Sequence, residues 1–294
     1  MSEGPAVDPA ALHAHWRRLA RAAAPPWLHG EVARRMAERL PVIRAQPAAI
    51  VQWPGWSGAS DALLAAAYPK ARRVLAEPTP ALAEHARARR SRWWPRARAV
   101  AEAVVDAEIG AASAELLWSN MALHFSADLQ ASFARWQRAL AVGGFVMFSC
   151  FGSDTLKVLR ALYARLGWGA PAQDFVDMHD LGDMLLHAGF ADPVMDQETL
   201  TLTFADAASL LDELRGLGGN AAPARHPGLR TPRWRARLLD SLEALRGADG
   251  RLALGFEIVY GHAFKTVARG ATGETQVSLD AMRGLVRASR TSRR

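Results

Sequence analysis

Cysteine is almost absent from the chain, because Cys150 is the only one among 294 residues. A single thiol excludes an intrachain disulfide and a zinc site built from cysteine ligands. No stretch approaches the roughly 20 consecutive apolar residues that span a bilayer. The first ten residues, MSEGPAVDPA, lack the apolar region of a signal peptide. We therefore expect a cytoplasmic protein with no membrane partner.

Lysine is scarce as well. Only three of the 36 basic residues are lysines, so that arginine carries almost all of the net charge of +7. Arginine presents a planar fork of donors that suits phosphate and carboxylate groups, although a genomic preference for arginine gives the same bias. The positive balance is compatible with an acidic partner but does not require one.

Arginines gather in residues 225–237. Two interpretations stay open: a solvated basic face, and a surface that steers an acidic protein partner. Trp234 is the only aromatic residue within the cluster, and nucleic-acid surfaces interleave several aromatic residues with their basic ones. We therefore expect no nucleic-acid partner. The cluster consists of Arg225, Arg230, Arg233, Arg235 and Arg237.

Patterns for metal binding and nucleophilic catalysis are also lacking. His179, Asp183 and His187 would share one face of a helix, but a surface or substrate-facing helix explains that spacing, and we expect no metal site. Cys150 ends an apolar run with no base beside it, which is typical of a small core residue. We assign no catalytic residue.

What the sequence does contain is a regular alternation of short apolar runs and amphipathic segments. Its composition, 50% apolar and 22% charged, is that of a globular protein. The alternation predicts an α/β fold with a doubly wound, mostly parallel sheet. Strands are expected near residues 48–53, 73–77, 99–105, 114–119, 145–150, 193–204 and 252–264, and helices near residues 11–24, 27–40, 59–68, 80–90, 126–141, 153–166, 178–188 and 206–217. Ligands of such folds bind outside the carboxyl ends of the strands, which draws attention to residues 53–60, Glu77 and residues 118–124.

The segments at these ends resemble the class I methyltransferases that use S-adenosylmethionine. Residues 115–125, ELLWSNMALHF, are similar to the DLVWSNLALQW segment of the biotin-pathway malonyl-acyl-carrier-protein O-methyltransferase family. Residues 139–144 (ALAVGG), 152–156 (GSDTL), 178–190 (MHDLGDMLLHAGF) and 256–264 (FEIVYGHAF) also fit that family. A mitochondrial assembly-factor family with arginine-hydroxylating activity shares much of the same block, so that the fold alone does not decide the reaction.

The resemblance implies a Rossmann-like methyltransferase fold with a helical lid, and a set of site residues. It implies that Glu77 accepts hydrogen bonds from the ribose hydroxyls, and that Glu102 or Asp106 lies near the adenine amino group. On the substrate side it points to His124, which follows the fourth strand. A malonyl carboxylate would also favour an arginine near the site, for which Arg160 and Arg165 are available, and the partner would be an acidic acyl-carrier protein. The cofactor residues that the resemblance implies are Gln52, Gly55, Gly58, Glu77, Asp106 and Asn120.

The first loop departs from the family pattern of an acidic residue followed by three alternating glycines. Gln52 stands at the acidic position, and Pro54 and Trp56 replace the first two glycines. Proline removes an amide donor and fixes φ, and the indole is expected to obstruct the cofactor. A double substitution of Pro54 and Trp56 by glycine would then restore cofactor affinity.

Three functions are compatible with these observations. The first is an S-adenosylmethionine-dependent methyltransferase that acts on a carboxylate such as that of malonyl-acyl-carrier protein in biotin biosynthesis. The alternative is a catalytically degenerate methyltransferase-fold protein that serves as a binding or regulatory partner. In a third hypothesis, the pocket holds a different small molecule, on which the tryptophans stack.

A single methyltransferase-like domain is expected over residues 1–265. Within it we expect N-terminal helices over 11–40, a core of about 45–150 and 190–265, and lid helices of about 151–188 and 205–250. A loose tail is expected to follow over residues 266–294.

Overall fold

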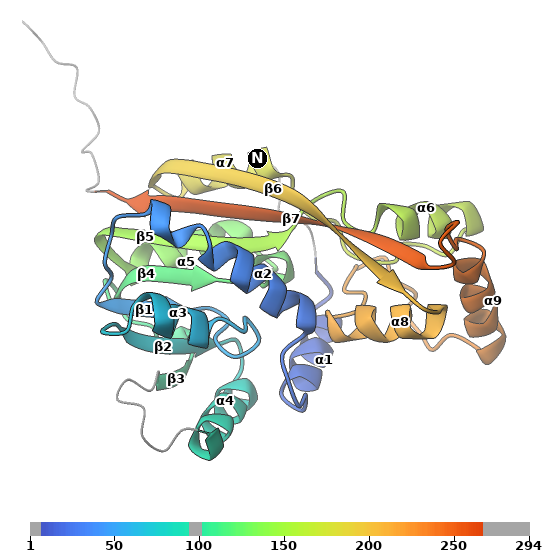
Figure 1. Ribbon diagram of the computed structural model, residues 1–294, viewed down its shortest axis with the longest axis horizontal. Helices are drawn as coiled ribbons and strands as arrows, with labels where there is room; N and C mark the ends of the chain where they lie inside the picture. The colour runs from blue at the N-terminus through green and yellow to red at the C-terminus, as the bar shows by residue number, and fades with distance from the viewer. Residues whose placement is uncertain (1–6, 94–101, 267–294) are drawn as a thin grey trace, which may run out of the picture.

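A seven-stranded sheet runs through the middle of the protein, whose computed structural model describes residues 7–93 and 102–266 (Figure 1). The strand order is β3-β2-β1-β4-β5-β7-β6. Neighbours from β3 to β5 are parallel, whereas β7 is antiparallel to both β5 and β6. The expected doubly wound, mostly parallel sheet is confirmed. The tail from residue 267 and residues 99–101 of an expected strand lie outside the described residues. The strands are β1 (Ala49–Gln52), β2 (Arg72–Glu77), β3 (Glu102–Val105), β4 (Ala114–Ser119), β5 (Leu140–Phe151), β6 (Phe190–Phe204) and β7 (Leu252–Lys265).

The register of the parallel strands brings their carboxyl ends to one edge. Gln52 at the end of β1 pairs with Leu75 on β2 and with Trp118 on β4, and Glu77 pairs with Val105 on β3. The loops that follow these strands therefore meet at one side of the sheet, where such folds bind ligands.

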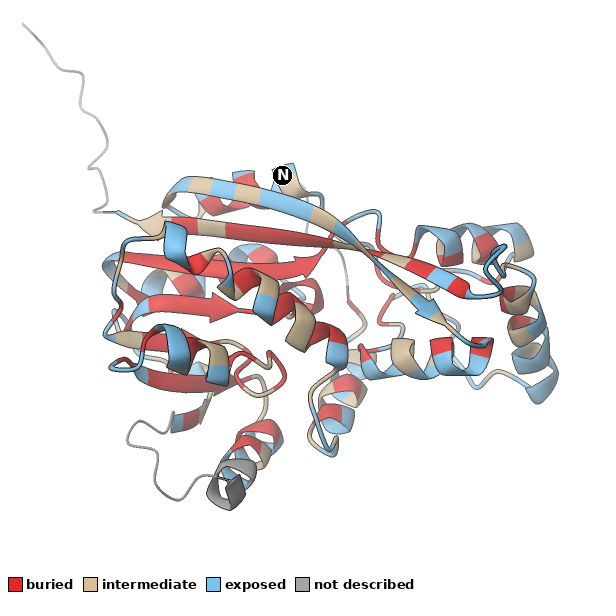
Figure 2. Cartoon of the chain, viewed as in Figure 1, coloured by how far each residue is buried: buried red, intermediate tan, exposed pale blue. Residues whose placement is uncertain are grey.

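Helices cover both faces of the sheet, and the central strands are consequently buried on both sides (Figure 2). On one face α5 and α7 pack through Phe133 and Leu185 against Leu117 and Phe148. On the other face α2 and α3 belong to a separate apolar cluster with the opposite side of the strands. The helices are α1 (Pro9–Leu19), α2 (Trp27–Ala37), α3 (Asp61–Ala67), α4 (Pro80–Trp93), α5 (Leu129–Ala139), α6 (Lys157–Leu166), α7 (Met178–His187), α8 (Ala207–Gly216) and α9 (Pro232–Glu243), with short 3-10 turns η1 (Leu40–Val42), η2 (Asp106–Glu108) and η3 (Leu123–Phe125).

The segments expected to form a lid separate into two groups. Strands β6 and β7 continue as a two-stranded ribbon beyond the end of β5, and α6, α8 and α9 gather around it (Figure 1). Helix α7, expected in the lid, instead packs on the sheet beside α5, because Leu181, Met184 and Leu185 give it an apolar face.

Helix α9 lies within the range 205–250 in which lid helices were expected, but no individual helix was predicted there after residue 217, because the sequence is polar and arginine-rich. Thr231 caps its first turn by accepting a hydrogen bond from the Trp234 amide, and Pro232 occupies the first helical position. Leu238 and Leu242, one turn apart, are its buried residues. Within the described ranges 7–93 and 102–266, none of the helices is both long enough and apolar enough to cross a membrane.

Candidate functional site

Two cavities lie at the carboxyl ends of the strands, and α1 and Phe125 contribute to the walls of both. The sheet-end cavity, of about 560 Å³, lies where β1 and β4 end and is bordered by the segments after β2 and β3. The lid cavity, of about 500 Å³, lies between α1, α6 and α8. Both volumes are typical of small-molecule sites. The sheet-end cavity is lined by, among others, His13, Trp16, Trp53, Pro54, Pro78, Thr79, Asp106, Ser119, Phe125, Arg135 and Trp136.

Aromatic rings and polar groups share the lining of the sheet-end cavity. The ring of Trp53 lies 6.1 Å from that of Trp136, edge to face, and the Arg135 guanidinium lies 4.9 Å from the Trp53 ring centre. Arg135 also forms an ion pair of 3.5 Å with Asp106. Burial, opposed by Arg135, raises the pKa of the Asp106 carboxyl. The hydroxyl of buried Ser119 and the indole nitrogen of Trp136 have no hydrogen-bond partner in the described chain.

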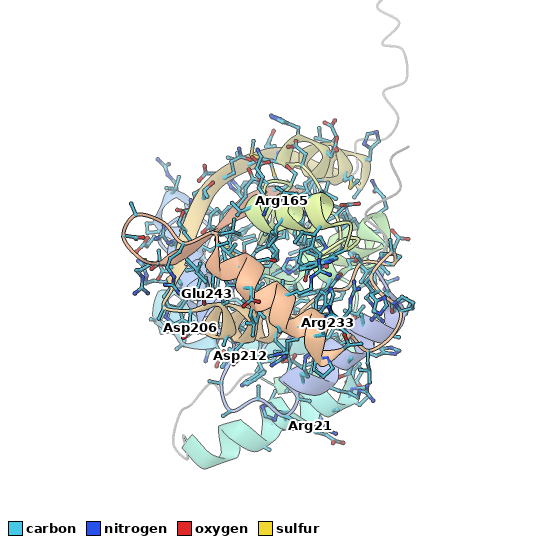
Figure 3. The ribbon with its side chains drawn as sticks, turned by 90° about the vertical axis from the view of Figure 1, so that its right-hand side faces the viewer. Arg21, Arg165, Asp206, Asp212, Arg233 and Glu243 are labelled. Carbon is cyan, nitrogen blue, oxygen red and sulfur yellow. The ribbon has the colours of Figure 1, made fainter. Side chains whose placement is uncertain are left out.

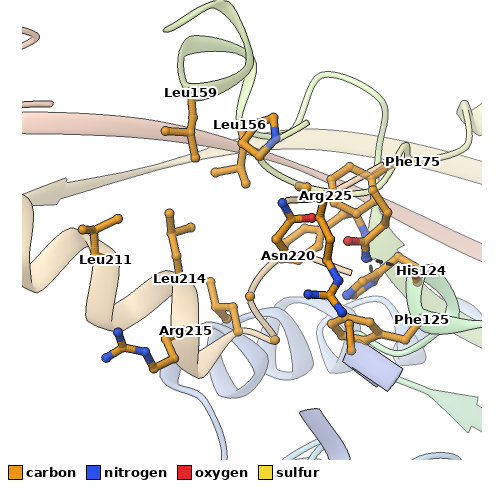
Figure 4. A pocket seen from close by; sticks show the side chains of 18 of the residues that line it. His124, Phe125, Leu156, Leu159, Phe175, Leu211, Leu214, Arg215, Asn220 and Arg225 are labelled. Carbon is orange, nitrogen blue, oxygen red and sulfur yellow. Dashed lines mark hydrogen bonds between the residues drawn. The ribbon is translucent and has the colours of Figure 1, made fainter. Parts of the chain in front are cut away.

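The lid cavity has an apolar interior and polar groups towards α1 (Figure 4). Leu156, the residue before α6, and Leu159 of α6 face Leu211 and Leu214 of α8 across it. The polar lining residues are Arg18, His124, Tyr163, Gln173, Asn220, Arg215 and Arg225.

His124 is a buried residue of the lid cavity, with its ring among Phe125, Phe151 and Phe175 at centroid distances of 4.4 to 5.9 Å. Its Nδ1 accepts a 3.4 Å hydrogen bond from the Phe151 amide. Burial, with the nearby histidines His29 and His15 adding to it, holds the pKa of His124 well below 6.5. The imidazole is therefore neutral at physiological pH and carries no charge into the cavity.

Helix α1 and Phe125 divide the two cavities. The rings of His15 and Phe125 stack with centroids 4.3 Å apart, and Trp16 meets Phe125 edge to face at 5.8 Å. Two contacts fasten α1 to the segment after α8: Asp8 forms an ion pair of 3.1 Å with Arg225, and Arg18 donates a 2.6 Å hydrogen bond to a backbone carbonyl. The dividing wall is thus made of side chains of α1 and of the turn η3 rather than of the sheet.

Comparison with curated proteins decides the family of the chain. A malonyl-[acyl-carrier protein] O-methyltransferase from Gallionella capsiferriformans is 39% identical over 249 residues, which cover 82% of this chain and 85% of that protein. Proteins of the same name from Halorhodospira halophila and Nitrosospira multiformis are 38% and 36% identical, over 81% and 84% of their own lengths. The chain belongs to the malonyl-[acyl-carrier protein] O-methyltransferase family.

Solved structures agree on the fold of this family member. The YcgJ protein of Bacillus subtilis superposes with a TM-score of 0.54 over 81% of this chain and 99% of its own, at 12% identity. A putative methyltransferase from Bacillus halodurans gives 0.53 over 79% and 99%, at 14% identity. These likenesses support the Rossmann-like methyltransferase architecture. No protein-family model matches the chain.

The methyltransferase's first loop, residues 53–58, folds down onto Glu77. The amide of Trp56 donates a 2.6 Å hydrogen bond to Glu77 Oε1, and the carboxyl group is fully buried. Its other oxygen, Oε2, finds no hydrogen-bond partner among residues 7–93 and 102–266. Burial raises the pKa of Glu77 to about 8, although the Trp56 amide lowers it. Glu77 therefore lies behind the wall of the sheet-end cavity, next to the lining residues Pro78 and Thr79.

Gly55 and Gly58 permit this close packing of the loop. A Cβ atom on Gly55 would lie 2.3 Å from Leu75 Cβ and 2.9 Å from Glu77 Oε1. On Gly58 it would lie 2.6 Å from the Pro54 carbonyl oxygen. Both distances are far below van der Waals contact, so that the two glycines are required by contacts within the chain itself.

Trp56 does not obstruct the sheet-end cavity, contrary to the expectation from the sequence. Its ring packs edge to face on His85 of α4, with centroids 4.5 Å apart, and contacts the cluster of Leu75, Ala86 and Ala103. Of the two residues that replace glycines, only Pro54 lines the cavity. The sequence could not show this, because the direction of the indole depends on where α4 lies.

Trp56→Ala is expected to lower the free energy of unfolding by about 3 kcal/mol, because a large aromatic contact with α4 and β2 is lost. The measurement is urea unfolding followed by circular dichroism. Trp27→Ala is the control, because that side chain is 63% exposed and should cost under about 0.5 kcal/mol. A variant as stable as wild type with tighter cofactor binding would restore the obstruction hypothesis.

Two of the other expected cofactor residues are held by contacts inside the fold. Buried Gln52 donates to Asp61 Oδ1 at 2.9 Å. Buried Asn120 donates to the carbonyls of His29 and Gly58 at 2.8 and 2.7 Å, and its Oδ1 accepts from Ser149. Neither residue lines the sheet-end or the lid cavity, whereas Asp106 lines the sheet-end cavity directly.

On the substrate side the structure separates the two expected residues. His124 lines the lid cavity, as described above. Arg160 lies behind its wall, where it donates to the Gln173 carbonyl at 2.5 Å and stacks 5.3 Å above Phe175. Arg18 and Ser119 line the cavities but were missed by reasoning from the sequence. Nothing in the pattern pointed to Arg18, whereas Ser119 belongs to the family-like segment 115–125 and could have been named from it.

Proposed function

We propose that this protein transfers a methyl group from S-adenosylmethionine to the free carboxylate of a malonyl thioester carried on an acyl-carrier protein. The observation that carries the proposal is the pair of adjoining cavities at the carboxyl ends of the strands, in a chain whose relatives bear that enzyme's name. One cavity suits a flat, polar ligand and the other a thioester arm.

The sheet-end cavity fits the cofactor. A purine has a flat apolar face and a polar edge, and Trp53 and Trp136 supply aromatic surface beside the Asp106 carboxylate. The buried Ser119 hydroxyl lacks a hydrogen-bond partner in the described part of the chain, which is costly unless a ligand satisfies it. Asp106 would accept from an exocyclic amine. Glu77 would act as a positioning residue, because it holds the loop that carries Trp53 and Pro54.

The lid cavity would hold the acceptor. Its interior is lined by leucine and phenylalanine side chains, which would desolvate a carboxylate, and desolvation together with correct alignment is what methyl transfer to a carboxylate requires. Arg18 and Arg225 line the same cavity and would attract a negatively charged acyl group. Neutral His124 at its inner end leaves the carboxylate unprotonated and without a competing positive charge.

The reaction needs no general base. When bound, S-adenosylmethionine supplies a methyl group on a positively charged sulfur, and a carboxylate oxygen accepts it without losing a proton. The chain therefore contributes by binding, orienting and excluding water. Because the two cavities are divided by Phe125 and His15, the acceptor carboxylate must approach past this pair.

A first experiment is calorimetric titration of the purified protein with S-adenosylmethionine and with S-adenosylhomocysteine. We expect a Kd below ~100 μM, which corresponds to about −5.5 kcal/mol. Asp106→Asn should weaken binding by about tenfold, because a neutral amide oxygen then replaces the charged acceptor of the hydrogen bond and the amide NH2 group faces the donor amine unfavourably. Asp174→Asn is the matched control, since Asp174 is 92% exposed in its side chain and lies outside both cavities.

The second part of the test is transfer itself. Malonyl-acyl-carrier protein incubated with S-adenosylmethionine should gain the mass of one methyl group, whereas acetyl-acyl-carrier protein, which lacks a free carboxylate, should gain none. No heat up to millimolar cofactor from a folded sample, together with no methylated product, would contradict the proposal.

A further inference from the structure

We infer that residues 229–237, at the junction of the α8–α9 segment with α9, form the docking surface for the acidic carrier protein; this rests on the proposed function. Residues 214–239 contain six arginines and no acidic residue. A surface of one sign of charge attracts a partner of the other and raises the rate of encounter. The docking surface is defined here by Leu229, Arg230, Arg233 and Arg237.

Two of these arginines are exposed on one face of α9, and the guanidinium of one of them, Arg237, also lies 5.8 Å from the Trp168 ring centre. Arg233 and Arg237 are four residues apart and both are exposed, which places them on the same side of the helix. Arg230 donates a 2.9 Å hydrogen bond to the Trp168 carbonyl and lies 4.5 Å above the Trp234 ring. Figure 3 shows Arg233 at one end of α9, apart from Asp206, Asp212 and Glu243, which lie towards the other end.

Leu229 gives this surface an apolar contact. The side chain is 98% exposed, on the loop that precedes α9, with Arg230 beside it in sequence. A single exposed leucine needs no explanation by itself. Beside Arg230, however, it adds an apolar contact to a charged surface, a combination that is common at protein interfaces.

The arginines at the start of α9 work against the stability of the helix. Arg233 and Arg235 lie in its first turn, which contains no acidic residue. The amino end of a helix carries a partial positive charge and favours acidic residues. Residues that break such a local rule tend to serve function rather than folding.

The position of the surface suits delivery of a substrate arm. The same segment runs on from Gly219, Asn220 and Arg225, which line the lid cavity. Asp8, the residue that caps α1, forms an ion pair with Arg225, and its amide donates a hydrogen bond to the Ala221 carbonyl. These contacts tie the segment to the wall between the cavities. A carrier docked on Arg233 and Arg237 would lie beside the cavity that its thioester arm must enter.

The test compares two substrates that share the acyl group. Steady-state methyl transfer is measured with malonyl-acyl-carrier protein and with malonyl-N-acetylcysteamine, a small thioester without a carrier. In Arg233→Glu/Arg237→Glu we expect KM for the carrier substrate to rise at least tenfold, and the effect of added salt on it to shrink. For the small thioester kcat/KM should stay within threefold of wild type. The melting temperature should be unchanged or higher, because an acidic residue then occupies the first turn of α9.

Two further variants sharpen the result. Leu229→Ser changes no charge and should raise the KM for the carrier substrate several-fold, without a change in melting temperature. Arg44→Glu/Lys70→Glu changes the net charge by the same amount at the amino ends of the strands, and should leave both substrates unaffected. An equal loss in this control, or an equal loss with the small thioester, would overturn the docking surface. Absence of transfer to either substrate by the wild-type protein would instead contradict the proposed function.

Discussion

Glu77→Gln is expected to keep its stability between pH 6.5 and 8, a range in which the wild-type protein should lose about 1.5 kcal/mol of unfolding free energy. Burial raises the pKa of Glu77 from 4.5 to about 8 in the folded protein. Glutamine is neutral at every pH, and its Oε1 still accepts the hydrogen bond from the Trp56 amide. The variant therefore removes the titration without removing the contact.

The sign of this effect follows from proton binding. Above pH 4.5 an unfolded chain has ionised this carboxyl group, whereas the folded protein retains the proton until about pH 8. The unfolded state then binds fewer protons, so that stability is fully present below pH 4.5 and falls as the pH rises through 8. The range above pH 6.5 is the useful one, because the lowered pKa values of the buried histidines act below it.

The measurement is urea unfolding at pH 6.5, 7.25 and 8. Glu84→Gln on the exposed face of α4 serves as control and should retain the wild-type slope. Equal slopes in wild type and Glu77→Gln would mean that the carboxylate is already ionised at pH 6.5.

The same variant separates two roles in cofactor binding. If Glu77 only positions the loop, the affinity of Glu77→Gln for S-adenosylhomocysteine should stay within threefold of wild type. If the Glu77 carboxylate accepts hydrogen bonds from the ribose hydroxyls, the variant should lose tenfold or more in affinity.

The sequence allowed the sheet and its functional edge to be predicted, because local patterns determine both. Alternating apolar runs and helical segments give the α/β order, and parallel strands bring residues 53–60 and 118–124 to one edge. What local pattern cannot give is the direction of a side chain in a loop. Whether Trp56 faces the cavity depends on His85 and Ala86 of α4, which lie about thirty residues further along the chain.

Burial of polar residues was the second unpredictable feature. Gln52 and Asn120 have the residue types of cofactor ligands, yet each donates a hydrogen bond to a residue of another element, Asp61 at the start of α3 and His29 of α2 respectively. Helix α9 shows the opposite difficulty. Its arginines made the stretch look like an exposed loop. The one-turn spacing of Leu238 and Leu242, which pack against the rest of the protein, was therefore not recognised as a helix.

The free energy of unfolding should fall more steeply at acid pH than protonation of the carboxylates alone would explain. His15→Phe should remove a large part of this additional fall. The His15 ring is buried in the stack with Phe125 and Trp16, and its Nε2 has no hydrogen-bond partner in the part of the chain that the structure describes. Desolvation, together with the positive charges of His29 and Arg18, lowers the pKa of His15 to about 3. Burial lowers the pKa of His29 to about 4, although its Nδ1 pairs with the Ser57 carbonyl at 2.8 Å.

Here the folded state binds fewer protons than the unfolded chain, so that stability is present above pH 6.5 and is lost as the pH falls towards 4 and then 3. The difference between 6.5 and 3 corresponds to about 5 kcal/mol for His15, at about 1.4 kcal/mol per pH unit. Unfolding free energies measured from pH 7 to 4 should therefore fall steeply in wild type and in the control His179→Phe, which changes an exposed residue of α7. They should fall about 3 kcal/mol less in His15→Phe over the same range. A parallel fall in all three proteins would show that His15 is protonated in the folded state, and would mean that water reaches the wall between the two cavities.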